Sequence, residues 1–274
     1  MSGTTSSDSI RILFFGDLVG RPGRTAVKNY LARLRDTDAM PDVVIANGEN
    51  VSHGFGLLRK HYDELREAGV DIFTGGNHIW DQKEVFSYID YANLLRPHNF
   101  PVGSPGRGAA IFEVRGHSIG VINLIGQVFM ANYNSPWEQL EETIYDMLAV
   151  TPVLFLDFHA EATAEKIAMG WQASKLGVSA MVGTHTHVQT ADARLLNNRM
   201  GYITDAGFNG SYNSVIGMEA EASLQRLKSL IPQRMEVGPE DILQVNAVEF
   251  EIDKRSGFCR NVRRINELIT LTDE

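Results

Sequence analysis

The sequence predicts an α/β fold with layered, mixed sheets. Apolar runs of strand length alternate along the chain with segments whose apolar residues recur at helical spacing, as in β-α-β units. One pair of short apolar runs is separated only by a turn, which indicates an antiparallel hairpin within the sheets. The length of 274 residues and the hydrophobic content of 43% suit one large core, so we expect residues 10–274 to form a single domain.

The first half of the chain begins as a β-α-β unit. Ile10–Phe15 is apolar except for Arg11 and ends at Gly16-Asp17, which is typical of a buried strand that opens into a loop. Helical spacing follows over Thr25–Arg35, and a second strand is expected over Val43–Ala46. The next expected elements are a helix over Tyr62–Ala68, a strand over Val70–Thr74, and a hairpin of Ala109–Val114 and Ser118–Leu124.

The second half continues this alternation and ends in strands. The expected elements are helix Trp137–Met147, strand Val153–Phe158, helix Ala162–Leu176, strand Ser179–Gly183, strand Arg199–Thr204, helix Ala220–Leu230 and strand Gln244–Ile252. Gly177 follows the helix over Ala162–Leu176 directly, as expected of the glycine that commonly ends a helix.

Composition excludes several classes of protein. The net charge of −9 disfavours broad nucleic-acid binding, because the surface as a whole repels a polyanion. A single cysteine, Cys259, excludes an internal disulfide framework and cysteine-rich metal sites, so we expect a reducing, cytoplasmic location. No stretch approaches the roughly 20 apolar residues that span a bilayer. Residues 1–9 are polar, lack the features of a signal peptide and are expected to be a disordered tail.

Polar side chains follow directly on five of the apolar strand runs. These side chains are Asp17, Glu49-Asn50, Asn77-His78, His159 and His185-x-His187. In open α/β sheets, ligands bind outside the carboxyl ends of the strands, so segments far apart in sequence would meet there. If these polar residues occurred in loops by chance, they would not all lie at strand ends. Their recurrence there therefore indicates a common site.

The residue types in this set are those of a metal centre. Carboxylates, imidazoles and amide oxygens without thiolates suit Mn, Fe or Zn. Seven candidate ligands are too many for one tetrahedral ion and suit two ions about 3.5–4 Å apart that share a carboxylate. Each residue alone has a plainer interpretation: Asp17 as a turn former or helix cap, and Glu49-Asn50 or Asn77-His78 as ordinary loops. The whole constellation favours the metal hypothesis.

The histidines differ in how strongly the sequence assigns them. His185 and His187 are alternate residues of an extended segment, which project the same way and can present two imidazoles to neighbouring ions. His61 is expected at the surface. His53 lies in the glycine-flanked loop after Glu49-Asn50, and whether it faces a substrate stays open.

The series of motifs resembles that of the calcineurin-like metallophosphoesterases, which carry Asp-x-His, Gly-Asp-x-x-Asp, Gly-Asn-His, an isolated His and Gly-His-x-His. Gly76-Asn77-His78, His159 and Gly183–His187 match closely. Two motifs depart. Asp17-Leu18-Val19 lacks the second ligand His, and Gly48-Glu49-Asn50 has Glu in place of the bridging Asp.

These departures are typical of one bacterial branch, the YmdB-like family, which the sequence resembles over Ile10–Ile265. The matching stretches are Gly16–Gly23, Ala46–Asn50, Thr74–Trp80, Asp157–Thr163 and Gly183–Asp192. The resemblance implies a four-layer α/β/β/α sandwich with two mixed sheets, the metallophosphoesterase fold. Thr204–Ser211 departs from the Gly-Met-Thr-Gly-Pro segment that members tend to carry, so substrate preference is expected to differ there. The role of Gly207–Ser211 stays open.

The resemblance also implies a role for each site residue. One ion would be held by Asp17, Glu49, Asn50 and His187, and the other by Glu49, Asn77, His159 and His185. Glu49 would bridge the two ions, and Asn50 would supply the ligand that the missing His gives in other families. His78 would be the catalytic residue, which stabilises the transition state and protonates the departing oxygen.

We therefore expect a binuclear metal-dependent phosphoesterase that acts by attack of a metal-bridging hydroxide. The resemblance implies a phosphodiesterase whose substrates are 2′,3′-cyclic nucleotides. The resemblance suggests two iron ions, Fe2+ or Fe3+, while the ligand types also allow Mn2+ or Zn2+. The expected partner is a small phosphodiester, and a homo-oligomer stays open. The alternatives are a phosphomonoesterase, or a metal-binding regulatory or RNA-turnover scaffold with only slow hydrolytic activity.

Overall fold

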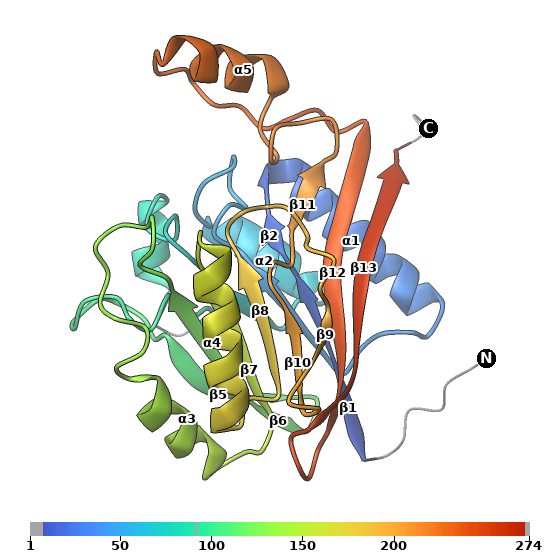
Figure 1. The fold of residues 1–274 in the computed structure, drawn as a ribbon. Coiled ribbons are helices and arrows are strands. Elements are labelled where there is room, and N and C mark those ends of the chain that lie inside the picture. Colours follow the sequence, from blue (N-terminus) through green and yellow to red (C-terminus); the bar gives the residue numbers. More distant parts are fainter. Residues whose placement is uncertain (1–7, 91, 272–274) are drawn as a thin grey trace.

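The computed structural model describes residues 8–90 and 92–271, and these residues form two sheets that pack face to face with helices on their outer sides (Figure 1). Of the tail expected over residues 1–9, residues 1–7 lie outside the described part of the chain. Ser9 already belongs to strand β1 (Ser9–Phe15).

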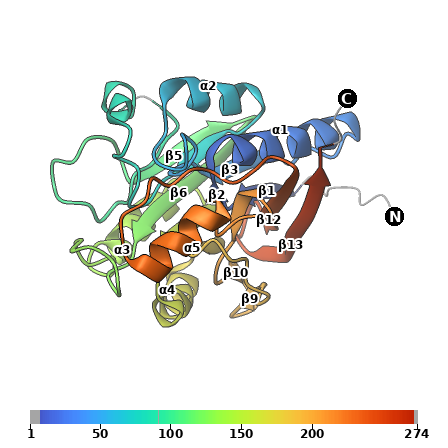
Figure 2. The same cartoon turned by 90° about the horizontal axis from the view of Figure 1, so that it is seen from above.

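The first sheet has the strand order β2-β11-β12-β1-β3-β4, with β13 beside β12. Its other strands are β2 (Asp17–Leu18), β3 (Val43–Asn47), β4 (Ile72–Thr74), β11 (Phe208–Ser211), β12 (Ile242–Asp253) and β13 (Cys259–Thr270). Strands β1, β3 and β4 run parallel, whereas β12 is antiparallel to β1. Helices α1 (Gly20–Asp36) and α2 (Arg59–Glu67) cover its outer face and share a core with it (Figure 2).

The second sheet has the order β5-β6-β7-β8-β10-β9. Its strands are β5 (Ala109–Val114), β6 (His117–Ile125), β7 (Leu154–His159), β8 (Ala180–Thr184), β9 (Arg194–Leu196) and β10 (Met200–Ile203). The expected hairpin is confirmed: β5 and β6 are antiparallel, and Arg115 and Gly116 both have positive φ, as the tightest hairpin turns require. Helices α3 (Leu140–Leu148) and α4 (Thr163–Leu176) cover the outer face.

Successive residues of the central strands point alternately to the helices and to the facing sheet. In β1, Leu13 and Phe15 pack in the core beneath α1, while Phe14 points between the sheets and stacks on Phe155 at 5.3 Å between ring centroids. Because both faces are covered, these strands are apolar at nearly every position. This explains why their apolar runs were recognisable in the sequence.

Two helices begin earlier than the sequence indicated, and the earlier start of the second one bears on the predicted position of His61. Helix α1 begins at Gly20 rather than Thr25, since Pro22 is tolerated in the first turn of a helix. Helix α2 begins at Arg59 rather than Tyr62, which places His61 in its first turn. The expectation that His61 lies at the surface is wrong. Its side chain is buried, with Nδ1 2.8 Å from the Ser52 hydroxyl, and burial followed by the charge of Arg24 lowers its pKa to about 4.

Helix α5 (Ala220–Ser229) stands away from the two sheets, at the end of the molecule where β11 and β12 meet (Figures 1 and 2). We call residues 212–241, which carry this helix, the α5 arm. Backbone bridges from Met218 to Val215 and Val237 close its base. Within α5, Ser223 is the buried residue. No helix in residues 8–90 or 92–271 has both the length and the apolar character to cross a membrane.

Candidate metal centre

The predicted site residues meet at the carboxyl ends of parallel strands from both sheets. Strands β1, β3 and β4 lead to Asp17, Glu49-Asn50 and Asn77-His78, while β7 and β8 lead to His159 and to His185 and His187. Hydrogen bonds or close contacts connect every one of these residues to another member of the set. The structure thus brings together all eight side chains selected from the sequence.

The tightest part of the site surrounds Nε2 of His159. This atom lies 2.9 Å from Asn77 Oδ1, 3.1 Å from Glu49 Oε1 and 3.1 Å from His185 Nδ1. Two ligand atoms that share a cation at about 2.1 Å are themselves about 3.0–3.4 Å apart, so these separations fit a common ion. Glu49, His159 and His185 also form a cluster whose ligand atoms all lie within 4.8 Å of one another.

Hydrogen bonds place a proton on Nδ1 of His159. The Thr184 hydroxyl donates to Asp157 Oδ1 at 2.7 Å, so it accepts from Nδ1 of His159 at 2.9 Å. Nε2 then faces Glu49 and Asn77: as an imidazolium the ring donates to their oxygens, and once Nε2 has lost its proton it offers a lone pair to a cation. Such outer partners orient metal-ligating imidazoles in general.

The other two imidazoles are oriented in the same manner. His187 Nδ1 donates to the Ile216 carbonyl at 2.9 Å, which leaves Nε2 to face Asn50 and Asp17. His185 Nε2 lies 3.2 Å from a carboxylate oxygen of Glu161, which leaves Nδ1 to face His159. Both residues have positive φ, 100° for His185 and 62° for His187, so they do not lie on the extended segment that the sequence indicated. Non-glycine residues adopt positive φ at turns and also at functional sites, where the surrounding contacts hold them in place.

A looser second group consists of Asp17, Asn50 and His187. The amide nitrogen of Asn50 lies 3.3 Å from both Glu49 Oε1 and His187 Nε2, and His187 Nε2 lies 3.7 Å from Asp17 Oδ1. Asp17 is fully buried, and its Oδ1 has no hydrogen-bond donor among the described residues. A buried carboxylate oxygen without a donor is costly, and a cation would satisfy it. Ligation by Asn50 would require its amide to turn over so that Oδ1 faces the same space.

Charges in the site interact strongly. Burial raises the pKa of Asp17. Burial also opposes ionisation of Glu49, but the charge and hydrogen bond of His159 outweigh it and lower the pKa of Glu49. His185 shows the reverse balance, because burial and then the positive charge of His159 lower its pKa to about 3. A neutral His185 beside an ionised Glu49 is the state in which both can bind a cation.

Gly76 lets the ligands approach one another. A Cβ atom at this position would lie 2.3 Å from both Glu49 Oε2 and His159 Nε2, which is far inside van der Waals contact. Any other residue at Gly76 would therefore displace two candidate ligands. The glycine of Gly76-Asn77-His78 is part of the site for this steric reason.

A buried ion pair supports the loop that carries His185 and His187. Lys166 of α4 donates to Asp205 at 2.6 Å, and both side chains are 1% exposed. The same carboxylate accepts from the Thr186 hydroxyl at 2.7 Å and from the Gly207 backbone at 2.8 Å. Phe208, in the segment where substrate preference was expected to differ, stacks on His187 at 5.5 Å. This segment therefore packs directly on a candidate ligand.

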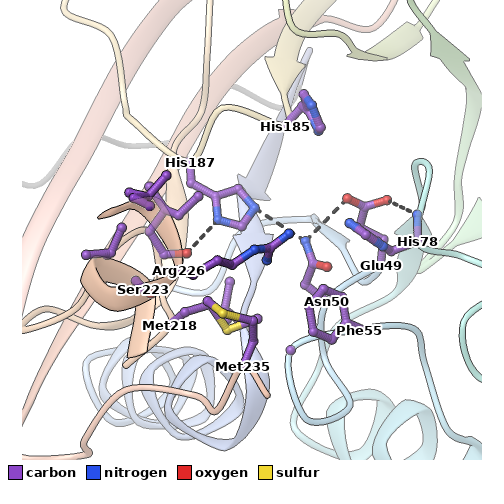
Figure 3. A pocket seen from close by; sticks show the side chains of 15 residues that line it. Glu49, Asn50, Phe55, His78, His185, His187, Met218, Ser223, Arg226 and Met235 are labelled. Atoms are coloured by element: carbon purple, nitrogen blue, oxygen red, sulfur yellow. Dashed lines mark hydrogen bonds between the residues drawn. The ribbon is translucent and has the colours of Figure 1, made fainter. Parts of the chain in front are cut away.

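A cavity of about 380 Å3 opens over the ligands, between the strand ends and the α5 arm (Figure 3). Its polar wall contains Glu49, Asn50, His78, His185 and His187. The rest of its lining is mostly apolar: Val19, Gly54 and Phe55 come from loops at the strand ends, and Val215, Ile216, Met218, Ser223, Arg226, Leu227 and Met235 come from the α5 arm. The α5 arm thus covers one side of the cavity that lies at the strand ends.

His78 stands at the boundary between the two walls. Its backbone NH donates to Glu49 at 2.9 Å, and its ring packs edge-on against Phe55. Nδ1 lies 2.8 Å from Asp81 Oδ2, so Nε2 is the ring nitrogen left for a substrate. His53 lies outside this arrangement, with an exposed side chain and its ring 6.0 Å from that of His61.

Several contributing residues were not selected from the sequence. Asp81 and Glu161 orient histidines by a single contact each, and Arg226 reaches the cavity from the arm. Asp157 and Thr184 lie inside strands, where a polar residue carries no signal of its own. Only the spacing Asp157-x-His159 could have suggested a carboxylate that supports a ligand.

Comparisons with known proteins give the same family that the sequence motifs indicated. The family model described as "YmdB-like protein" matches residues 13–265. The 2′,3′-cyclic-nucleotide 2′-phosphodiesterase of Bacillus subtilis is 44% identical over 257 residues, which cover 93% of this chain and 96% of that protein.

Solved structures support the match. A crystal structure of a Mycoplasma pneumoniae protein described as a novel phosphatase has 35% identity and a TM-score of 0.87, covering 95% of this chain and 94% of its own. A hypothetical protein from Thermus thermophilus has 37% identity and the same TM-score of 0.87, with coverages of 94% and 99%. The expected four-layer metallophosphoesterase fold is confirmed. The chain belongs to the YmdB-like family.

Proposed function

We propose that this protein is a metal-dependent phosphodiesterase that hydrolyses 2′,3′-cyclic nucleotides. The observation that carries the proposal is the convergence of Glu49, Asn77 and His185 on Nε2 of His159, beside a cavity large enough for a small organic ligand. The Bacillus subtilis relative, whose name states this activity, supplies the substrate class.

The site is proposed to hold two cations. Glu49, Asn77, His159 and His185 would hold one, and Asp17, Glu49, Asn50 and His187 the other. These cations would neutralise charge on the phosphoryl oxygens and acidify the attacking water. Iron is the proposed metal, and the same ligands suit Mn2+ or Zn2+.

His78 is proposed to act on the leaving group. Water forms a bond to phosphorus while one ester P–O bond breaks, and the departing sugar oxygen needs a proton. Protonated His78 can supply it from Nε2, because Asp81 holds the ring by its contact with Nδ1. The ring faces the cavity beside Glu49, so it reaches substrate without serving as a main ligand.

The cavity favours a nucleotide over a small phosphomonoester. Phe55, Met218 and Met235 form an apolar wall of the cavity, and such apolar and sulfur-containing side chains suit the faces of a nucleobase. A small phosphomonoester would leave this wall uncovered. The apolar wall therefore supports a substrate with a large flat group.

The proposal is tested by metal analysis together with a substrate panel. Protein purified without added metal is expected to contain two equivalents of metal per chain. It is expected to hydrolyse 2′,3′-cyclic nucleotides faster than phosphomonoesters under Fe, Mn or Zn. The proposal would be overturned if the purified protein contained no metal and hydrolysed no phosphoester after Fe, Mn or Zn was added. That outcome would favour the scaffold alternative.

A further inference from the structure

We infer that Arg226 of the α5 arm binds the phosphoryl oxygens of the substrate from the side opposite the candidate metal ligands. This inference rests on the proposed phosphodiesterase function and adds a substrate-binding residue to it. The helix that carries Arg226 would then be a functional part of the site rather than a surface insertion.

The position of Arg226 is the first observation. Its side chain lines the same cavity as Glu49, Asn50 and His187. In Figure 3 its guanidinium extends from α5 into the cavity, toward Asn50 and His187. A group bound on the candidate ligands would therefore lie between them and this cation.

The second observation is that no carboxylate neutralises Arg226. Within the described part of the chain its guanidinium has no ion pair or hydrogen bond, whereas Arg24 pairs with Glu64 and Arg59 with Asp63. Acidic residues are abundant, since the net charge is −9. On α5 itself, Glu221 bonds to Gln225 instead. An unpaired guanidinium beside a cavity is a ready site for an anion.

The chemistry of a guanidinium suits a phosphoryl group. A guanidinium presents parallel N–H donors that match two oxygens of a phosphoryl group, which a lysine ammonium does not. Charge spreads over these oxygens during phosphoryl transfer, so the contact strengthens as the reaction proceeds. Because α5 buries only Ser223, the helix has few contacts that would prevent small adjustments around a ligand.

The test compares Arg226→Met and Arg226→Lys with Lys228→Met, which removes an exposed cation from the same helix outside the cavity wall. The probe is inorganic phosphate, titrated calorimetrically into metal-loaded protein, and kcat and KM for a 2′,3′-cyclic nucleotide are measured in parallel. Metal content and melting temperature are expected to stay unchanged in all three variants.

We expect Arg226→Met to weaken phosphate binding about tenfold, Arg226→Lys to weaken it less, and Lys228→Met to leave it unchanged. Equal phosphate affinity of wild type and Arg226→Met, or equal losses at positions 226 and 228, would overturn the inference. The two proposals fail separately. A wild type that hydrolyses no phosphoester refutes the proposed function, whereas the phosphate titration alone decides the role of Arg226.

Discussion

The two walls of the cavity are built in opposite ways. At the strand ends, Glu49 and His159 are fully buried, and each ring nitrogen of His159 has a hydrogen-bonding partner. On the α5 arm, Leu227 is 70% exposed, and the guanidinium of Arg226 has no hydrogen bond or ion pair within the described residues. One wall is fixed by a dense polar network, and the other is an exposed helix with little support.

This difference suggests a division of labour. Geometry within a few tenths of an ångström matters where cations are held, and buried, hydrogen-bonded side chains provide it. Recognition of a substrate tolerates a more mobile wall whose residues can change without cost to the core. Substitutions of the ligands or their support on the strand side should therefore affect metal content or stability, and those on the arm should affect contacts with the substrate and leave the metal in place.

The largest effect is expected from Glu49→Gln on the strand side. Glutamine keeps the size of the side chain but removes the negative charge that would let two cations lie together. We expect metal content to fall toward one equivalent or none and turnover to fall roughly 10³-fold. Elemental analysis and steady-state kinetics measure both, with Glu113→Gln, at an exposed position of β5, as the control. Two retained equivalents with normal turnover would remove Glu49 from the bridging role.

The next effect, at His78, lies on the boundary between the walls. His78→Ala should keep its metal while the rate falls ~10²–10⁴-fold, as is typical for loss of a general acid. Asp81→Asn should keep its metal and lower the rate less than His78→Ala, because Asp81 acts only by holding the His78 ring through one contact. His117→Ala, at a half-buried histidine of β6, is the matched control. A joint loss of metal and activity would instead make His78 a ligand.

A third effect concerns the support of the strand side. Lys166→Met leaves the buried carboxylate of Asp205 without its cation, which typically costs about 3–5 kcal/mol of unfolding free energy. We expect the lower end of this range, since Thr186 and Gly207 still donate to Asp205. Lys175→Met, at an exposed position of the same helix, should change stability by less than about 0.5 kcal/mol. Urea unfolding of both variants decides whether the pair stabilises the loop of His185 and His187.

The same contrast explains how far the sequence could predict the site. Asp17 and His159 were recognisable because they lie at the carboxyl ends of two strands that are mostly apolar and buried on both faces. Strand β13 was missed because it pairs only with β12 and its polar residues, such as Arg260 and Arg263, leave no apolar run. Arg226 was missed for a different reason. An arginine on an amphipathic helix resembles any solvated surface residue until the fold places that helix over a cavity.

The smallest expected effect tests the arm without touching any charge. Leu227 lines the cavity, and a bound nucleobase that covers about 40 Å2 of its side chain would gain about 1 kcal/mol, or roughly fivefold in affinity. Leu227→Ser should therefore raise KM for a cyclic nucleotide about fivefold. It should leave kcat unchanged, because this contact is the same in the ground state and the transition state.

The control for this prediction is Leu224→Ser, at an exposed leucine of α5 outside the cavity wall, which should change neither KM nor kcat. Since inorganic phosphate has no apolar group to pack on Leu227, its affinity should be equal in both variants. Equal KM values for the two variants would show that the substrate does not reach the arm through apolar contact. A loss of metal in Leu227→Ser would mean that the arm also shapes the metal centre, and the division between the two walls would fail.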